Sequence, residues 1–338
     1  MEFAGSHVLS VAQFERADVE AVFSCADRME PYAKRQRVTR VLEGAILGSM
    51  FFEPSTRTRV SFGSAFNLLG GEVRETTGIE NSAIAKGESL FDTARVLSGY
   101  SDVIAMRHPE NGSVAEFAAA SRVPVINGGD GSNEHPTQAL LDLYTIKSEL
   151  ASRGRQVDGL RIAMVGDLRF GRTVHSLCRL LCLFDDVQVT LVSPQELRMP
   201  GEICDMLRGA GHHVSEIEQL EEGIAHVDIV YSTRLQEERF ASTEDADLYR
   251  GRFRLNQQIY TRNCEPNTVI MHPLPRDSRE PARELDEDLN DNPNLAIFRQ
   301  TDNGVVVRMA LFALVLDVAD KVDAHAQDVR WFATRRDL

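Results

Sequence analysis

The sequence predicts an α/β protein with two doubly wound parallel-sheet domains. Short, nearly continuous apolar runs rich in β-branched residues alternate along the chain with helical patterns, which is typical of parallel strands that helices cover on both faces. The chain has 338 residues, which exceeds the length at which a single hydrophobic core usually stops growing. We therefore expect two such domains rather than one.

Seven segments have the composition of buried strands, and each is followed by loop residues and then a helical pattern. They span residues 44–52, 101–108, 123–129, 160–167, 187–193, 227–234 and 267–273. A change of composition at residues 147–159 separates the first three from the other four. We expect one domain at residues 1–146 and a second at 152–300, with a C-terminal helix over 303–325 that packs back on the first. The acidic residues 280–294 are expected to form a solvated surface segment.

The charge and composition argue against several classes of function. The formal net charge is -14, from 37 Lys and Arg against 51 Asp and Glu, so nucleic acid is not expected as a partner. No apolar run approaches the roughly 18 residues that span a bilayer. The first residues do not resemble a secretory signal, so we expect a cytoplasmic protein without membrane contact. The five cysteines show no C-x-x-C spacing, and we expect them to be reduced and to hold no metal.

Polar residues follow six of the expected strands at the point where each strand ends. Because open α/β sheets bind ligands beyond the carboxyl ends of their strands, these residues are candidates for one convergent, cationic site. They are Ser55–Arg59, Arg107 with His108, His135 with Gln138, Arg172, Arg234 with Gln236, and the turn His272–Arg276.

The segment "FFEPSTRTRVSF", residues 51–62, has the pattern of a strand, a Pro54 turn and the start of a helix. Ser55 and Thr56 are good N-cap residues. Free backbone N–H groups and the positive end of the helix dipole favour a phosphate at such a point, and Arg57 can bind phosphate oxygens with two parallel hydrogen bonds. The alternative is an ordinary capped helix with two solvated arginines.

A second segment is also similar to a phosphate-binding loop. "GDLRFGRT", residues 166–173, nearly matches the P-loop pattern G-x-x-x-x-G-K-[ST] after a strand, but Arg172 stands in place of the lysine. A P-loop relies on the compact ammonium of that lysine among the β- and γ-phosphates. A P-loop-like nucleotide hydrolase is therefore a minor alternative.

Six segments together resemble the carbamoyltransferase family, in order and with compatible spacing, from about residue 8 to about residue 318. They are "FFEPSTRTRVSF", "MRHP", "HPTQALLDLYTI", "GDLRFGRTVHSL", "STRLQEER" and "MHPLPR". The last is similar to the branch that uses aspartate, since the ornithine branch has a cysteine in the corresponding H-C-L-P. The resemblance implies a carbamoyl phosphate-binding domain at residues 1–146, an aspartate-binding domain at residues 152–300, an active site in the cleft between them, and neither a metal nor an organic cofactor.

The resemblance also implies roles on the carbamoyl phosphate side. Arg107 is expected to bridge the phosphate and the carbonyl oxygen, His135 to donate a hydrogen bond to that oxygen, and Gln138 to contact the amide. The backbone carbonyls of Leu274 and Pro275 are expected to accept from the same NH2 group. The residues expected to hold the phosphate are Ser55, Thr56, Arg57 and Thr58. Those expected to be catalytic are Arg57, Thr58, Arg107 and His135.

On the aspartate side, the resemblance implies that Arg172, Arg234 and Gln236 clamp the two carboxylates, together with Lys86. "NSAIAKGES" resembles a mobile loop whose Ser82 and Lys86 reach into the active site of a neighbouring subunit. This implies a homotrimer with shared active sites. Separate regulatory chains are a further partner that the resemblance leaves open.

The expected reaction is transfer of the carbamoyl group from carbamoyl phosphate to the amino group of L-aspartate, a step of pyrimidine biosynthesis. Its products are N-carbamoyl-L-aspartate and phosphate. Two alternatives from other classes stay open, a catalytically silent subunit of the same fold that scaffolds another enzyme and the nucleotide hydrolase. Product formation that depends on aspartate and needs no added metal separates the expected enzyme from both.

Overall fold

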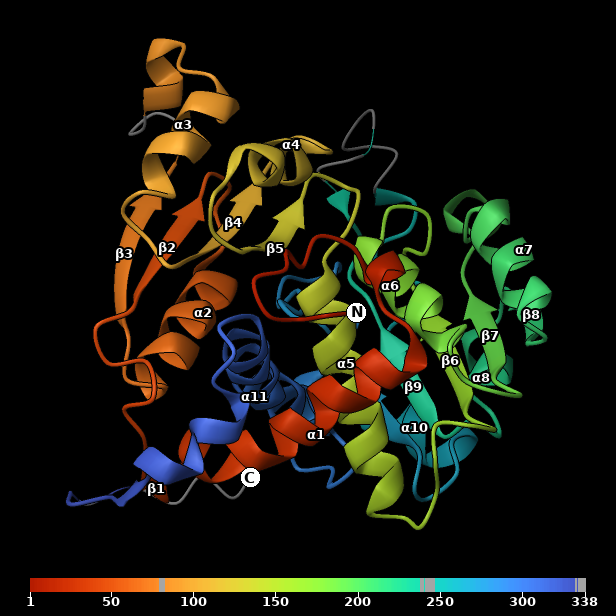
Figure 1. Cartoon of the computed structure of the whole chain (residues 1–338). Coiled ribbons are helices and arrows are strands. Elements are labelled where there is room, and N and C mark those ends of the chain that lie inside the picture. Colours follow the sequence, from red (N-terminus) through yellow and green to blue (C-terminus); the bar gives the residue numbers. More distant parts are fainter. Residues whose placement is uncertain (79–82, 238–239, 241–246, 332, 334–338) are drawn as a thin grey trace. The chain divides into compact units, whose positions relative to one another are not determined.

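The computed structural model describes residues 1–78, 83–237, 240, 247–331 and 333 (Figure 1). The chain divides into two compact units, of which the first comprises residues 1–141 and 302–338 and the second residues 142–301. Each unit contains a parallel sheet with helices packed against it. The predicted α/β class with two parallel-sheet domains is therefore confirmed.

The first unit is built on a four-stranded sheet in the order β3-β2-β4-β5, with all neighbours parallel. Its strands are β2 (Ile46–Phe51), β3 (Glu72–Thr77), β4 (Val103–His108) and β5 (Val125–Asp130). Its helices include α1 (Arg16–Ala33), α2 (Thr56–Leu68), α3 (Leu90–Leu97), α4 (Ser113–Ala120) and most of α11 (Ile297–Val315). A two-stranded antiparallel ribbon joins β1 (Arg37–Val38) to β11 (Gln327–Asp328).

Two layers of side chains cover this sheet. Met50 and Met106 pack with Phe117 of α4 on one face. On the other face Phe62 of α2 lies against Phe51, with ring centroids 6.2 Å apart, and against Phe312, with centroids 5.9 Å apart. The alternation of neighbouring residues between the two faces explains why a strand buried on both sides is apolar throughout.

The second unit is built on a five-stranded parallel sheet in the order β10-β9-β6-β7-β8. Its strands are β6 (Arg161–Val165), β7 (Gln188–Val192), β8 (His213–Ile217), β9 (Ile229–Ser232) and β10 (Val269–Met271). Its helices are α6 (Arg172–Leu181), α7 (Gly201–Gly209), α8 (Leu220–Gly223) and α10 (Gln257–Asn263). The helix α5 (Pro136–Ala151) runs from the first unit into the second.

All seven predicted strands are present, and the described residues also contain four that were not predicted, the short ribbon strands β1 and β11 and the sheet strands β3 and β8. β3 and β8 are polar and partly exposed, and each lies at the edge of its sheet. An edge strand whose side chains face solvent tolerates polar residues, so β3 and β8, unlike the buried edge strands β5 and β10, lack the apolar run used for the prediction.

The C-terminal helix differs from its predicted bounds of 303–325. Helix α11 begins earlier and ends earlier, at Ile297–Val315. Asp317 stops it with a left-handed backbone (φ +54°), and the N–H of Val318 donates to the carbonyl of Ala313 at 2.8 Å. This is a Schellman motif in which an aspartate stands where glycine is commonest. The chain continues in two short 3₁₀ turns.

The acidic segment 280–294 was expected to be solvated, and this prediction is wrong for part of it. Glu284 and Asp286 are only 6% and 7% exposed. Arg254 Nε donates to both carboxylate oxygens of Asp286, at 2.8 and 2.9 Å, which compensates the burial of that charge. The partners of Glu284 belong to the site described below.

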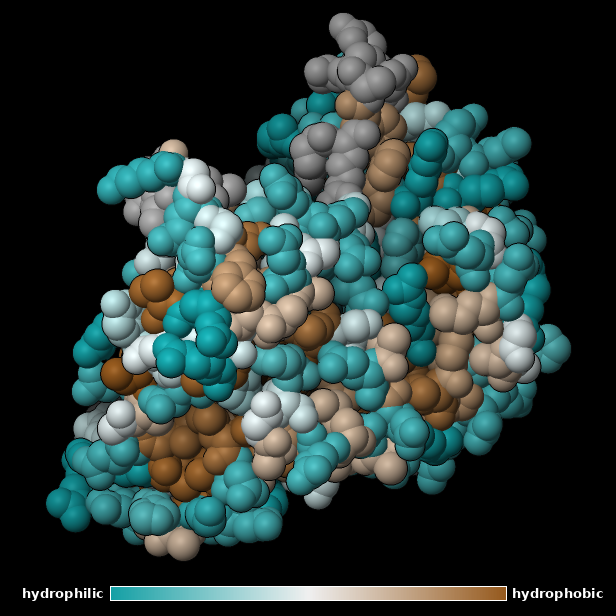
Figure 2. Space-filling model, turned by 45° about the horizontal axis from the view of Figure 1, so that its top comes forward, coloured by the Kyte–Doolittle hydropathy of each residue, from teal (hydrophilic) through white to brown (hydrophobic). Residues whose placement is uncertain are grey.

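The face drawn in Figure 2 is largely hydrophilic, with hydrophobic residues in separate areas between the polar ones. In the part of the chain that the structure describes, no helix combines the length and the apolar character needed to cross a membrane.

Candidate active site

In the first unit, the predicted site residues gather at one edge of the sheet. β2, β4 and β5 are parallel neighbours, so their carboxyl ends lie side by side. β2 leads to the segment Ser55–Thr58, β4 ends with Arg107 and His108, and β5 leads to His135 and Gln138. The structure therefore brings together, within this unit, the residues predicted to bind carbamoyl phosphate there.

Helix α2 begins at this edge, with Ser55 as its N-cap residue. Within the described residues Ser55 makes no side-chain capping bond to the helix, and its Oγ accepts instead from Arg107 Nη1 at 3.2 Å. The first N–H groups of a helix have no partner inside the helix, and they carry its positive partial charge. Thr56 and Arg57 are exposed and Thr58 is half-buried, so this helix end is open to an anion.

Arg107 is held in place at the start of α2. Its Nε lies 2.7 Å from Glu53 Oε2, and its side chain is only 12% exposed. Its backbone carbonyl accepts from the N–H of Phe52 at 2.9 Å, which joins the ends of β2 and β4. The guanidinium is therefore fixed beside the helix end where the anion would sit.

His135 is placed by the loop that precedes α5. The His135 carbonyl accepts from the N–H groups of Gln138 and Ala139, at 3.0 and 3.1 Å, so His135 begins the helix. The buried Asp130 accepts from the N–H of Glu134 at 3.2 Å, and Glu134 accepts in turn from Ser10 Oγ and from the N–H of Val11, both at 2.8 Å. Two buried carboxylates thus set the path of the loop. The imidazole itself is 4% exposed.

In the second unit, three neighbouring strands bring the other predicted residues to one edge. The order β10-β9-β6 places three carboxyl ends side by side. β6 leads to Arg172 at the start of α6, β9 to Arg234 and Gln236, and β10 to Leu274 and Pro275. The structure describes all five of these residues, and Arg172, Arg234 and Gln236 are half-buried.

The turns after β6 and β9 are in close contact. Gly166 has φ +112°, and a Cβ at this position would lie 2.4 Å from the carbonyl oxygen of Thr233. Only glycine fits both the backbone angle and the space. The carboxylate of Asp167 then bridges the two turns, because it accepts from the N–H of Phe170 at 3.0 Å and from the N–H of Gln236 at 3.0 Å.

Asp167 is a site residue that the sequence analysis missed. It is 1% exposed, and it fixes the backbone of Gln236 as well as the loop that leads to Arg172. Its position directly after a buried strand was the available signal. The first of these contacts argues against a P-loop, because the N–H of Phe170 in this loop donates to Asp167 and is not available to a nucleotide phosphate.

The turn after β10 is held by its own histidine. The N–H of Leu274 donates to His272 Nδ1 at 2.9 Å, and Leu274 adopts a left-handed backbone with φ +56°. His272 Nε2 lies 2.8 Å from Glu284 Oε1, and both side chains are buried. The turn therefore has a defined path, which the two neighbouring prolines, Pro273 and Pro275, restrict further.

A buried series of hydrogen bonds also holds the turn after β10. The N–H of His272 donates to Gln300 Oε1 at 2.9 Å, and Gln300 Nε2 donates to Asp142 Oδ1 at 2.6 Å. Tyr231 OH donates to the other oxygen of Asp142 at 2.6 Å. Burial raises the pKa of the Tyr231 hydroxyl well above its usual value, so it stays protonated and remains a donor.

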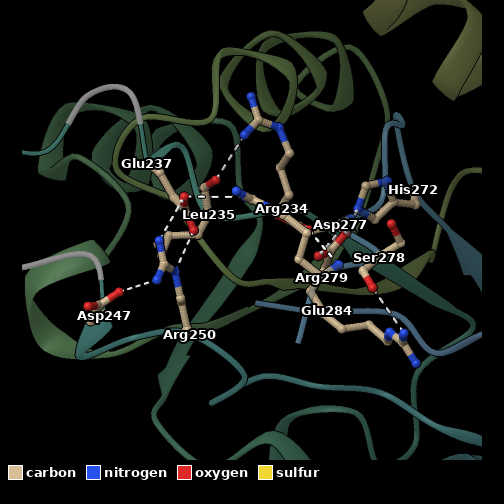
Figure 3. A network of polar contacts seen from close by, with 11 residues as sticks. Arg234, Leu235, Glu237, Asp247, Arg250, His272, Asp277, Ser278, Arg279 and Glu284 are labelled. Carbon is tan, nitrogen blue, oxygen red and sulfur yellow. Dashed lines mark hydrogen bonds and ion pairs between the residues drawn. The ribbon is translucent and has the colours of Figure 1, made fainter. Parts of the chain in front are cut away.

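Figure 3 shows how the turns after β9 and β10 meet. Arg234 Nη1 donates to the carbonyl of Leu235 at 3.2 Å. The pKa of Asp277 is lowered by hydrogen bonds from Arg279 and, to a lesser extent, by the charge of Arg234. The sequence analysis also missed Glu237, Asp277 and Glu284, which were indistinguishable from surface acids.

The predicted pair Ser82 and Lys86 is covered only in part. Ser82 lies outside the described residues. Lys86 is exposed at the end of the 3₁₀ helix η3 (Ala83–Lys86). Their role in a neighbouring subunit stays a prediction.

His108, a strand-end candidate to which no role was assigned, and His175 have structural partners. The N–H of Glu110 donates to His108 Nδ1 at 3.1 Å, and burial lowers the pKa of His108, which keeps it neutral. His175 Nε2 lies 2.7 Å from the carbonyl oxygen of Leu168. Among the residues that the structure describes, no group of three or more His, Cys, Asp or Glu side chains is arranged to hold a metal ion.

The two sets of residues offer different chemistry. The first unit presents backbone N–H groups, hydroxyls, a fixed guanidinium and an imidazole, which suit a phosphate and a carbonyl oxygen. The second presents Arg172, Arg234 and an amide, which suit carboxylates, and the carbonyls of a fixed turn, which accept from an NH2 group.

Comparison with known proteins places both sets in one family. The carbamoyl-P binding domain of aspartate/ornithine carbamoyltransferases matches residues 6–148, and the Asp/Orn binding domain of the same family matches residues 158–315. The chain is 75% identical over 335 residues to the aspartate carbamoyltransferase catalytic subunit of Saccharophagus degradans, and 74% identical over 336 residues to that of Cellvibrio japonicus. In both comparisons 99% of each chain is covered.

Solved structures give the same result. The catalytic subunit of M. jannaschii aspartate transcarbamoylase has a TM-score of 0.84 at 41% identity, covering 94% of this chain and 99% of that one. Aspartate transcarbamoylase from Trypanosoma cruzi, in complex with carbamoyl phosphate and aspartate, has a TM-score of 0.84 at 38% identity, with coverages of 93% and 98%.

Proposed function

This chain belongs to the aspartate/ornithine carbamoyltransferase family, and from that premise we propose that it transfers the carbamoyl group of carbamoyl phosphate to the amino group of L-aspartate. The products are N-carbamoyl-L-aspartate and phosphate. The observation that carries the proposal is that one chain contains both an open helix N-terminus at Ser55–Thr58, in the first unit, and two arginines, Arg172 and Arg234, at strand ends of the second unit.

We assign the phosphate to the start of α2 and to Arg107. The N–H groups and hydroxyls of Ser55, Thr56 and Thr58, together with the guanidinium of Arg57, hold its oxygens. Arg107 bridges the phosphate and the carbonyl oxygen, as its fixed place beside Ser55 supports. These roles belong to a carbamoyl phosphate-binding domain at residues 1–146.

We assign the carbamoyl group to His135, Gln138 and the turn after β10. His135 donates to the carbonyl oxygen, and Gln138 contacts the NH2 group. The carbonyls of Leu274 and Pro275 accept from that same group, and the defined path of their turn supports this assignment. Arg172, Arg234 and Gln236 clamp the aspartate carboxylates in an aspartate-binding domain at residues 152–300.

The reaction follows from the placement of charge. The amine of aspartate attacks the carbamoyl carbon, and the carbonyl oxygen becomes an oxyanion that Thr58, Arg107 and His135 stabilise. Such donors are typically worth about 3–4 kcal/mol each when well placed. The C–O bond to phosphate then breaks, and the leaving phosphate accepts the proton of the amine. The chemistry requires neither a metal nor an organic cofactor.

The test is product formation from carbamoyl phosphate with L-aspartate, with L-ornithine and with no acceptor, without added metal. We expect N-carbamoyl-L-aspartate and one equivalent of phosphate with aspartate alone. Product with ornithine would contradict the assigned branch. No product with any acceptor would favour the silent scaffold subunit.

We further propose that the enzyme acts in the cytoplasm, in pyrimidine biosynthesis, as a homotrimer with shared sites. Four large apolar side chains that are exposed in the single chain support an interface on the first unit. They are Val60, Phe91, Val96 and Tyr100, exposed by 51%, 57%, 46% and 67%. Lys86, exposed at the end of η3, and Ser82 are proposed to complete the site of a neighbouring subunit, and separate regulatory chains are compatible with this assembly.

Complementation tests the shared site. Arg57→Ala and Lys86→Ala are each expected to be inactive alone. A mixture allowed to exchange subunits should recover activity, because some trimers then contain one site without either substitution. Complete failure of the mixture, with exchange verified by mass, would contradict a shared site.

A further inference from the structure

We propose that Glu237 and Arg279 are positioning residues for the amino-acid substrate. Their ion pair joins the turn after β9 to the turn after β10, with Arg279 Nη2 3.3 Å from Glu237 Oε2. The inference rests on the proposed function, which assigns aspartate-binding residues to the first turn and carbamoyl-binding carbonyls to the second.

Glu237 is the anchor on the first turn. It follows Gln236 directly, and its side chain is 20% exposed. Arg250 donates to both carboxylate oxygens, from Nε at 2.7 Å and from Nη2 at 3.0 Å, and Arg250 is itself paired with Asp247. The hydrogen bonds from Arg250 lower the pKa of Glu237 despite its partial burial, so the carboxylate is charged at neutral pH.

Arg279 is the anchor on the second turn. Its Nε donates to Asp277 Oδ1 at 2.9 Å and its Nη2 to Asp277 Oδ2, which is a bidentate pair. The N–H of Asp277 donates to both carboxylate oxygens of Glu284, at 3.1 and 3.2 Å, and Glu284 contacts His272. The contacts therefore run without a break from His272, at the start of this turn, to Arg250 (Figure 3).

Because this ion pair is exposed, we infer that it positions the two turns rather than stabilising the fold. Arg279 is 64% exposed, and solvent screening limits what its single contact with Glu237 contributes to stability. Both turns are already fixed at their strand ends, Gln236 by Asp167 and Leu274 by His272. What the ion pair adds is a connection between the two turns just beyond Gln236 and Pro275, the residues assigned to the substrates. Small displacements there cost catalytic orientation rather than folding energy.

Charge gives Arg279 a second effect on the same site. The charge of Arg234 also contributes, after the hydrogen bonds and charge of Arg279, to the lowered pKa of Asp277. Without its bidentate partner, Asp277 would add an uncompensated negative charge to the turn after β10, which would disfavour the two carboxylates of aspartate. Arg279 neutralises Asp277 through the bidentate pair, so its loss should weaken aspartate binding selectively.

The experiment is steady-state kinetics on the full chain, with Glu237→Gln, Arg279→Gln and the double variant. Each single substitution should raise KM for aspartate about fivefold and leave KM for carbamoyl phosphate unchanged. The double variant should be no worse than the poorer single variant, because contacting residues are not additive. Arg262→Gln, which removes the same charge from α10 in the same unit, should leave both constants unchanged.

Two further measurements distinguish positioning from a general change of fold. Arg279→Lys keeps the attraction to Glu237 but loses the bidentate contact with Asp277, and it should recover part of the affinity. Added NaCl should raise KM for aspartate more in the wild type than in Arg279→Gln, since the exposed pair is screened by salt. Equal rises of both KM values, additive single effects, or a wild-type KM for aspartate in Arg279→Gln would overturn the inference.

The wild-type protein separates this inference from the proposed function. If the wild type forms no N-carbamoyl-L-aspartate, the proposed function fails. If it forms that product and the variants retain its KM for aspartate, only the role of Glu237 and Arg279 is overturned.

Discussion

The phosphate set in the first unit and the carboxylate set in the second are built in different ways. Four of the residues assigned to phosphate are consecutive, Ser55–Thr58, and the start of one helix gives their donors a common direction. Arg172, Arg234 and Gln236 come from two strand ends, and buried or half-buried carboxylates hold their turns. The backbone of one helix start fixes the positions of the first set. The positions of the second set depend on other residues, which are not assigned to contact the substrate.

This difference predicts how each set should respond to substitution. In the first set, removing a residue that binds the phosphate should reduce activity strongly. The structural change should stay local, because the backbone of α2 keeps its shape. In the second, substitutions at Asp167, Glu237 or Arg279 should also be felt, although none of them is assigned to contact a substrate.

The largest effect is expected for Arg57→Ala. Loss of the guanidinium removes charge-assisted bonds to the phosphate in the ground state and in the transition state, and kcat should fall by about 10²–10³-fold. The helix should persist, because Arg57 is exposed and alanine is the best helix former. Steady-state kinetics and circular dichroism check both expectations.

Arg59→Ala is the matched control for this substitution. Arg59 lies two residues further along α2 and is paired with Glu75, and it has no assigned role at the substrate. We expect activity within about twofold of the wild type, as for most substitutions on a surface. A comparable loss in both variants would mean that the phosphate is not bound by this helix end through Arg57.

A smaller and more selective effect is expected for Arg234→Ala. Removing one charged hydrogen-bond partner of a carboxylate costs about 1.5–3 kcal/mol, so kcat/KM for aspartate should fall by about 10- to 100-fold. KM for carbamoyl phosphate should hardly change. Arg169→Ala, which removes an exposed arginine stacked on Phe170 in the neighbouring turn, serves as the control. Equal losses of kcat/KM for aspartate and for carbamoyl phosphate would contradict the assignment of the two substrates to different units.

The fold could be predicted from the sequence more fully than the roles of the individual site residues. The seven buried strands and the residues at their ends could be predicted, because an apolar run identifies the strand and the parallel order brings the ends together. The helix start at Ser55 followed from its capping residues. Family resemblance supplied the individual roles, and the turn carbonyls of Leu274 and Pro275 would have had no other signal.

Other features could not be predicted from a single sequence. Glu284 lies in an acidic stretch that looks solvated, and only the fold brings it to His272 and to the N–H of Asp277. Glu237 pairs with Arg279 across 42 residues of sequence. The edge strands β3 and β8 lack an apolar run because half of their surroundings is solvent. In each case partners distant in sequence decide the outcome.

The smallest effect is expected for Asp323→Asn, which belongs to neither set and therefore gives the baseline. Asp323 accepts from Tyr32 OH at 2.7 Å and from Arg28 Nη2 at 3.3 Å, and these contacts tie the segment after α11 to α1. Because Asp323 is half-exposed, solvent screening limits its contribution, and the free energy of unfolding should fall by about 0.5–1 kcal/mol at pH 7. Both KM values should stay unchanged.

The pH dependence of this difference has a definite sign. The hydrogen bond from Tyr32, assisted by Arg28, lowers the pKa of Asp323 below its usual 3.8 in the folded protein. A carboxyl whose folded-state pKa is lowered contributes stability above its unfolded-state value and loses it as the pH falls through the folded-state value. Urea midpoints of the wild type and Asp323→Asn should therefore differ fully at pH 7 and converge below about pH 4.

Asp320→Asn is the control. Asp320 is a fully exposed neighbour of Arg28, and its substitution should change neither the urea midpoint nor the kinetics. A change of either KM in Asp323→Asn would mean that the C-terminal segment acts on the substrate sites, and the contrast between the two sets would then need a third contributor.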